Sequence, residues 1–280
     1  MLKNIKSFIV LCLCCLTFGA MAKPLTAQTQ QLDQSAKVEF LEDPSLTLNL
    51  QDVQAMSDRF QTWTSVDETS APSFGFTPSA YWLRFTLQRE PDAPAHWLLE
   101  IPYAKLDQLD FYPSNGQAVL TGAGRDLATR PVFSRFFVFP LQVGEEPTQV
   151  YLRVTSRYAL TVPLTVWAPD AFKRDELLTE LSQFMYFGGL AILTLYGSIL
   201  FIALRDSRFL FFGLYTLVLG LGIFAGNGFG RLVLWPSSPA FDDVSQSAFL
   251  CLAAIFSTKF ARKFLAVPGM TPWILTFIRG

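Results

Sequence analysis

Charged residues and histidine are scarce in this sequence. Only 16% of its 280 residues are Asp, Glu, Lys or Arg, whereas a soluble protein usually carries about 25%. His96 is the only histidine, which excludes a metal site built from several histidines. The formal net charge of −1 argues against a general electrostatic affinity for nucleic acid.

Sequence motifs for catalysis are also absent. No Gly-Lys-Ser/Thr phosphate loop occurs, and no serine or cysteine has an evident activating partner. The stretch GNGFG (226–230) is not a dinucleotide fingerprint, because no predicted strand precedes it. We therefore predict no catalytic residue, no metal site and no cofactor. An extracytoplasmic hydrolase that uses two carboxylates stays open as an alternative, since pairs of Asp and Glu are numerous.

The N-terminus has the pattern of a secretory signal. Residues 1–22 begin with two lysines, continue with an apolar run and end on Ala-Met-Ala, so we predict a cleaved signal peptide there and a flexible leader at 23–36. An uncleaved membrane helix is the alternative, although the apolar run is shorter than the roughly 20 residues that span a bilayer. Only Cys251 remains after cleavage, so no intrachain disulfide can form. The other cysteines lie in the signal: Cys12, Cys14 and Cys15.

The C-terminal part of the sequence contains long uncharged runs. Two runs of 22 residues are each long enough to cross a hydrocarbon core of about 30 Å as a helix. Neither has the polar face that a soluble two-helix core would need. We predict a short linker at 171–182 and a transmembrane region at 183–280. Its helices are expected at about 183–204, 209–230 and 244–261, with a fourth that begins near residue 273.

Basic residues flank these runs unevenly. Arg205 and Arg208 follow the first run, and Lys259, Arg262 and Lys263 follow the third, whereas two aspartates precede the third run. The tendency of basic residues to stay inside agrees with export of the N-terminal half by the signal. We predict a multi-pass membrane protein, in contact with the lipid bilayer, with its N-terminal domain exported to the outer side.

Three glycines in the second run are spaced four residues apart: Gly222, Gly226 and Gly230. This spacing places them on one helix face, where small residues allow a neighbouring helix to approach closely. We predict a helix-packing role for them. The alternative is that glycine is simply frequent in membrane helices.

Residues 37–170 alternate between apolar and polar positions, as strands do. The clearest examples are AYWLRFTLQ (80–88), TQVYLRVTS (148–156) and TVPLTVW (161–167). No helical run separates these short strands, so we predict an antiparallel β-sandwich. About 130 residues are enough to form a core of their own.

The polar faces of these strands carry aromatic and arginine side chains. If the faces align in one sheet, Trp82, Arg84, Tyr151, Arg153 and Trp167 form a platform that binds a small molecule or a carbohydrate by stacking and by guanidinium hydrogen bonds. In the alternative interpretation the tryptophans cover a sheet edge and the arginines are half-buried ion-pair partners. Three carboxylates are available for such pairs: Asp107, Asp110 and Glu100.

Several of these stretches resemble one receptor family. FGFTPSAYWLRFTL, LTGAGRDLATRPVFSRFFVFPL and VYLRVTSRYALTVPLTVW are similar to the extracellular type-2 module of bacterial seven-transmembrane receptors with diverse intracellular signalling modules (7TMR-DISM). YGSILFIALRDSRFLFFGLYTLVLG, NGFGRLVLWP and FARKFL resemble its membrane region. The resemblance implies a jelly-roll domain related to carbohydrate-binding modules, seven helices and a cytoplasmic output such as a cyclase, kinase or phosphatase. The sequence holds about three such helices and no output, so we expect it to be part of a longer reading frame.

Three functions follow as hypotheses. The first is a receptor whose periplasmic domain senses a small ligand and passes the signal inward through the helices. The second is a membrane-tethered carbohydrate-binding protein without signalling, and the third is the input part of a diguanylate cyclase or histidine kinase. The sequence does not fix the oligomeric state, and a homodimer stays open.

Overall fold

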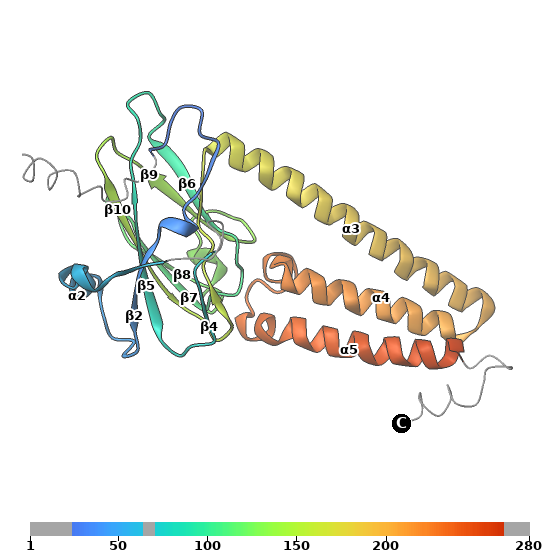
Figure 1. Ribbon diagram of the computed structural model, residues 1–280. Helices are drawn as coiled ribbons and strands as arrows, with labels where there is room; N and C mark the ends of the chain where they lie inside the picture. Colours follow the sequence, from blue (N-terminus) through green and yellow to red (C-terminus); the bar gives the residue numbers. More distant parts are fainter. Residues whose placement is uncertain (1–23, 64–70, 266–280) are drawn as a thin grey trace, which may run out of the picture.

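The structure has the two halves that strand alternation and long apolar runs predict. A computed structural model describes residues 24–63 and 71–265, and it consists of an antiparallel β-sandwich followed by three long apolar helices (Figure 1). The predicted fold class is therefore confirmed. The signal peptide expected at 1–22 and the fourth helix expected near residue 273 lie outside the described residues.

The larger sheet of the sandwich has six strands in the order β3-β2-β5-β10-β7-β8. Long strands occupy its centre, and short ones its edges. The strands are β2 (Glu39–Asp43), β3 (Gln61–Thr62), β5 (Ala80–Leu87), β7 (Gln108–Tyr112), β8 (Val119–Thr121) and β10 (Thr148–Thr155).

The second sheet has four strands in the order β1-β12-β6-β9. These are β1 (Gln31–Asp33), β6 (His96–Ile101), β9 (Phe137–Gln142) and β12 (Thr165–Trp167). A two-stranded ribbon joins β4 (Ser73–Gly75) to β11 (Leu160–Thr161).

The core of the sandwich comes from one side of each strand. Because side chains alternate along a strand, Leu83 and Phe85 of β5 and Leu152 of β10 all point between the sheets, where they are buried. Phe111 and Phe139 stack within the same core with ring centroids 4.6 Å apart. Each such side chain contributes roughly 1.5–3 kcal/mol to folding when it leaves water.

Residues 24–36 differ from the flexible leader expected at 23–36. Leu25 is fully buried in the core and its N–H donates to the carbonyl of Gln88 at 2.8 Å. Strand β1 pairs antiparallel with β12, which would otherwise present an open edge with unpaired backbone groups. The polar residues around β1 conceal this pairing in the sequence.

The helices begin directly at the sandwich. Helix α3 (Pro169–Leu204) starts two residues after β12, with Ala168 as its N-cap residue and proline in its first turn, a position that suits proline because its missing N–H is not needed there. The linker expected at 171–182 is therefore part of α3. At 36 residues and 1.5 Å per residue, α3 is about 54 Å long, so it extends beyond the hydrocarbon core.

Helix α4 (Ser207–Gly226) follows after a two-residue turn. Arg205 ends α3 in a left-handed conformation with φ 52°, and the side chain of Asp206 caps α4 by accepting from the backbone N–H of Arg208. Helix α4 ends four residues earlier than the predicted 230, and a π-helical segment (Gly230–Leu234) follows.

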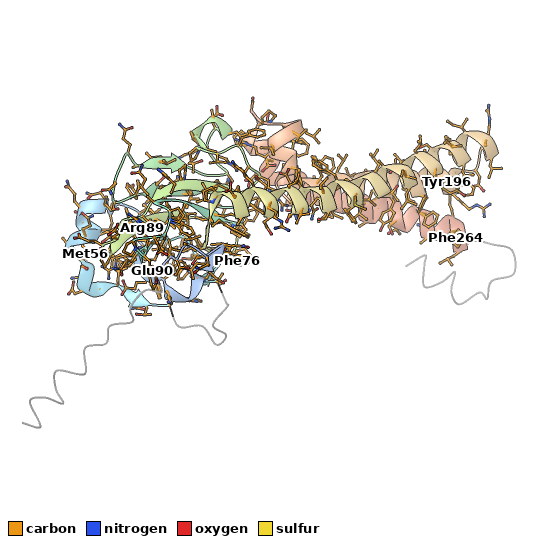
Figure 2. All side chains as sticks on the ribbon, turned by 90° about the horizontal axis from the view of Figure 1, so that it is seen from above. Met56, Phe76, Arg89, Glu90, Tyr196 and Phe264 are labelled. Carbon is orange, nitrogen blue, oxygen red and sulfur yellow. The ribbon has the colours of Figure 1, made fainter. Side chains whose placement is uncertain are left out.

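Helix α5 (Pro239–Leu265) is longer at both ends than the predicted 244–261. It packs beside α4, which in turn packs beside α3. The sandwich lies at one end of these helices, next to the α4–α5 connector, and the turn at 205–206 lies at the other end (Figure 1). Figure 2 shows Tyr196 and Phe264 at that far end, with apolar side chains along the length of the helices.

All three helices are long and apolar enough to cross a membrane. On α3, Met185 is 79% exposed and Ile202 is 73% exposed, which is far more apolar exposure than a helix in water tolerates. In a bilayer these side chains contact lipid. The three spans predicted from the sequence are thus present as helices.

Candidate functional site

Four of the five residues predicted for the ligand platform lie on one face of the six-stranded sheet. The register of β5 and β10 places Arg84 opposite Tyr151 and Trp82 opposite Arg153, on the face that points away from the core. Trp167 lies in β12, which belongs to the other sheet. The expected alignment of all five residues in one sheet does not occur.

A short helix covers much of this face. The helix α2 (Leu50–Ala55) and the turn after it pack on Trp82, which is completely buried and stacks on Tyr112. Arg84 is 8% exposed and donates from Nε to Glu39 Oε2 at 2.7 Å, with its guanidinium 4.2 Å above the Phe60 ring. Trp82 and Arg84 therefore stabilise the attachment of this segment.

The other three residues have different surroundings. Tyr151 is buried beside Trp82, and its hydroxyl donates to Gln149 Oε1 at 2.9 Å. Arg153 Nη1 lies 3.7 Å from Asp110 Oδ2. Asp110 is one of the carboxylates that the alternative interpretation proposed as ion-pair partners.

Trp167 donates from its indole N–H to Glu100 at 2.8 Å and packs edge-on against Phe172 of α3. Burial raises the pKa of Glu100, against the lowering effect of this hydrogen bond.

Beside Arg153, the surface opens into a cavity of about 870 Å³. Three arginines line it, and of these only Arg153 was predicted from the sequence to bind a ligand. Arg125 follows β8 and Arg157 follows β10, so both lie in loops with no periodic pattern to distinguish them. The full lining is Leu46, Phe76, Thr77, Pro78, Asp107, Gln108, Gly124, Arg125, Arg153, Thr155, Ser156 and Arg157.

Backbone packing fixes Asp107 in the lining of this cavity. The carbonyl of Asp107 accepts from the N–H of Gly124 at 3.0 Å. Gly122, with φ +145°, lies so close that a Cβ there would be 2.2 Å from the same carbonyl oxygen, so only glycine fits. The Asp107 carboxylate binds Arg157 through Nε at 3.0 Å and Nη2 at 2.8 Å.

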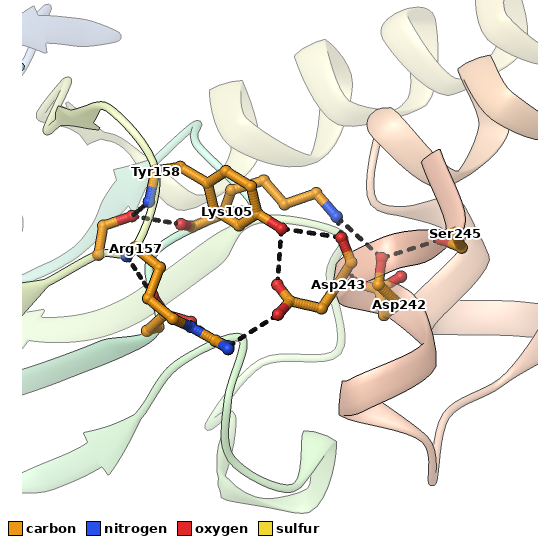
Figure 3. Close-up of polar contacts among 8 residues, drawn as sticks. Lys105, Arg157, Tyr158, Asp242, Asp243 and Ser245 are labelled. Carbon is orange, nitrogen blue, oxygen red and sulfur yellow. Dashed lines mark hydrogen bonds and ion pairs between the residues drawn. The ribbon is translucent and has the colours of Figure 1, made fainter. Parts of the chain in front are cut away.

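The same edge of the sandwich contacts the start of α5. Figure 3 shows Arg157 and Tyr158 pointing toward Asp243, and Lys105 toward Asp242. Arg157 Nη2 lies 3.0 Å from Asp243 Oδ2, and the Tyr158 hydroxyl lies 2.8 Å from both the carbonyl and the carboxylate of Asp243. Burial and the bond to Asp243 raise the pKa of Tyr158 to about 12, so the phenol remains a donor at neutral pH.

A second polar contact lies beside it. Lys105 Nζ is 3.4 Å from Asp242 Oδ2, and both side chains are largely buried. The indole N–H of Trp235 donates to the other carboxylate oxygen of Asp242 at 2.8 Å. Asp242 therefore joins the sandwich, the connector and α5 at one point.

Close backbone approach and buried cations complete this contact. Gly228 has φ +83°, and a Cβ there would lie 3.1 Å from the Arg135 carbonyl oxygen and 3.2 Å from the Ala104 Cβ. Arg231 is 4% exposed and donates to the Arg125 carbonyl at 2.8 Å, while its Nη1 is buried without a hydrogen bond among the described residues. Burial and the neighbouring Arg231 lower the pKa of Arg130 to about 10.

The three glycines of the second run divide between two environments. A Cβ at Gly222 would lie 3.3 Å from Leu250 and Phe249 of α5, and a Cβ at Gly226 would lie 2.7 Å from Gln246. Gly230 is outside α4, in the π-helical segment, against the Trp235 ring. Gly222 and Gly226 therefore face α5.

Two family models match the chain, one over the sandwich and one over the helical region. The model described as 7TMR-DISM extracellular 2 matches residues 35–168, and the one described as 7TM diverse intracellular signalling matches residues 179–280. A comparison with curated proteins gives no match. Both matched modules are of a receptor or sensor type and not catalytic. The chain therefore belongs to the 7TMR-DISM family, the receptor-like membrane sensors that combine an extracellular module with a 7TM region.

Proposed function

We propose that this chain is the sensing and transmembrane part of a signalling receptor. In this proposal the sandwich binds a small ligand in the periplasm, and the helices carry the change across the inner membrane to a cytoplasmic output. The observation that carries the proposal is that the sandwich contacts the helices twice. It continues into α3 without a flexible linker, and it rests on the start of α5 through Lys105 and Tyr158.

The distribution of charge supports this orientation. Arg205 and Arg208 at the α3–α4 turn, and Arg262 and Lys263 near the end of α5, lie at the end of the helices far from the sandwich. Basic residues favour the cytoplasmic side of a membrane. Ser114→Cys should then react with an impermeant thiol reagent in intact spheroplasts, while Ser207→Cys should react only after permeabilisation.

The two alternatives make different demands on the structure. A simple tether for a carbohydrate-binding domain needs one helix, whereas the described part of this chain has three, and the sandwich contacts two of them. The input part of a diguanylate cyclase or histidine kinase would have the same architecture as the receptor. It differs only in the output that the helices control.

Mechanical coupling through α3 provides the test. A flexible ten-residue Gly/Ser insert at Lys173 should leave ligand binding intact and abolish the response of a fluorophore attached at Ser207→Cys, with a screened ligand as the stimulus. The matched control is the same ten-residue insert at Ser114, in the exposed turn between β7 and β8, which leaves both contacts with the helices in place and should retain the response. A response that survives the flexible insert would contradict the proposal.

A further inference from the structure

The cavity beside Arg153 presents cationic groups to solvent. We propose that it takes a small organic anion, whose carboxylate or phosphate binds the guanidinium groups of Arg157 and Arg125 in competition with Asp243. This assignment names the class of ligand for the receptor proposed above. Only the consequence of binding rests on that proposed function. Binding itself can be measured without any signalling response.

The exposures of the charged side chains determine whether a ligand first meets positive or negative groups. The Arg157 side chain is 67% exposed and that of Arg125 is 30% exposed, whereas Asp107 is 15% exposed and Asp110 is 7% exposed. The two carboxylates lie behind the guanidinium groups and are occupied by them, with Asp107 on Arg157 and Asp110 on Arg125 and Arg153. A ligand that enters from solvent therefore meets N–H donors before acceptors.

Arg157 and Arg125 both keep donors for a ligand. Arg157 uses Nε and Nη2 for Asp107, and Arg125 uses Nη1 for Asp110 and the Thr121 carbonyl. Nη1 of Arg157 and Nη2 of Arg125 form no hydrogen bond with any residue that the structure describes. A guanidinium has five N–H donors in a planar fork that matches carboxylate and phosphate oxygens.

The rim of the cavity adds an apolar requirement. Phe76 is 81% exposed and Leu46 is 49% exposed, and both line the cavity. An aromatic ring in this position stacks on a flat or apolar group. The chemistry thus fits an anion that carries an apolar body, rather than an inorganic ion alone.

Arg157 links this cavity to α5. Its Nη2 lies 2.8 Å from Asp107 and 3.0 Å from Asp243 Oδ2. An anion bound to the same guanidinium weakens its attraction for Asp243 and so favours release of the α5 start from the sandwich. By linkage, removal of the Asp243 charge must strengthen anion binding by the same coupling factor.

The test uses the full chain in phosphatidylcholine nanodiscs and ligand-observed NMR, which detects weak binding. Phenylacetate and phenyl phosphate are the probes, and phenylacetamide is the neutral match for phenylacetate. We expect both anions to bind saturably, the amide not to bind, and Arg157→Gln or Arg125→Gln to weaken anion binding at least about tenfold. Arg174→Gln, an exposed position on α3 outside the cavity, should leave binding unchanged.

Two further variants keep the test decisive. Arg157→Lys retains the charge without the fork and should lose most of the affinity, while Asp243→Asn should tighten anion binding several-fold. The anion site would be overturned if neither anion binds, or if phenylacetate and phenylacetamide bind equally well. Unchanged anion affinity in Arg157→Gln would also overturn it. Unchanged affinity in Asp243→Asn would overturn the competition, and displacement of the probes by added phosphatidylglycerol would assign the site to a lipid headgroup instead.

This outcome is separable from that of the receptor proposal. If the Lys173 insert leaves the response at Ser207 intact, the mechanical coupling through α3 fails while anion binding stands. If neither acid binds while a screened ligand still drives the response at Ser207, the anion site fails and the receptor stands.

Discussion

The sandwich meets the helices through two junctions of opposite character. At the start of α3 the chain is continuous, and Trp167 packs on Phe172 and Val138, all of them buried. At the start of α5 the contact is non-covalent and polar, and it depends on Lys105 and Tyr158. We call these the apolar junction and the polar junction.

This difference determines which contact can open. Apolar burial is favourable in any orientation, whereas a protein hydrogen bond replaces one to water and contributes only about 1 kcal/mol net. The polar junction also contains Arg231, whose buried Nη1 has no hydrogen bond among the described residues, and such a group costs roughly 1–3 kcal/mol. The sandwich can therefore separate from α5 while it remains fixed to α3.

The largest predicted effect lies at the apolar junction. Phe172→Ala removes a side chain that is 4% exposed and should lower the free energy of unfolding by roughly 3–5 kcal/mol, because it leaves a cavity where Trp167 packed. Urea unfolding of the full chain in nanodiscs, followed by tryptophan fluorescence, measures this loss. Phe133→Ala is the control, since Phe133 is 76% exposed, and equal losses in the two variants would refute the packing role.

The polar junction should lose less. Lys105→Met removes the ammonium next to Asp242, whose carboxylate remains buried with Trp235 as its only donor among the described residues. The expected loss is about 1–3 kcal/mol. Adding Asp242→Asn should recover part of it, because the amide oxygen still accepts from Trp235 and no charge stays buried. Lys173→Met, at an exposed position on α3, should change stability by less than about 0.5 kcal/mol. If the double variant is no more stable than Lys105→Met, the ion pair does not act as described.

The smallest effect concerns Glu100, a charged group at the apolar junction. Burial and the nearby carboxylates of Asp175 and Glu176 raise the pKa of Glu100 above its usual 4.5, so the folded state favours its protonated form. Stability from this group is fully present below pH 4.5 and is lost as pH rises through the folded pKa. Glu100→Gln should keep the Trp167 hydrogen bond and raise the melting temperature by about 1–3 °C at pH 7.

The pH dependence separates this effect from a simple packing change. Near pH 4 the wild type and Glu100→Gln should melt at almost the same temperature, because Glu100 is then protonated in both folded and unfolded states. Glu42→Gln is the matched control, because this carboxylate lies on the six-stranded sheet and not at the apolar junction. A constant difference between wild type and Glu100→Gln from pH 4 to 7 would contradict the role of burial.

Periodicity predicts those parts of the fold that depend on neighbours in the sequence. Alternation places Leu83 and Phe85 in the core, and it places Trp82 and Arg84 together on the opposite face. Uncharged runs predict the three helices. Which sheet contains a given strand depends on pairing across the fold, so the sequence could not show that Trp167 lies apart from the platform.

Contacts between distant loops escape prediction for a similar reason. Lys105 and Asp242 are 137 positions apart, and Tyr158 and Asp243 are 85 apart. Neither pair belongs to a repeating pattern, and each forms only once the sandwich docks on the connector. Arg125 and Arg157 of the cavity are likewise brought together by the ends of β8 and β10.

A double-mutant cycle across the polar junction tests most directly whether the sandwich rests on α5. Tyr158→Phe and Asp243→Ala, alone and combined, are compared by urea unfolding of the full chain in nanodiscs. Because the Tyr158 hydroxyl lies 2.8 Å from the Asp243 carboxylate, we predict a coupling free energy of about 0.5–1.5 kcal/mol between the two substitutions. Additive effects, with a coupling free energy of zero, would contradict this contact and mean that the sandwich does not rest on α5.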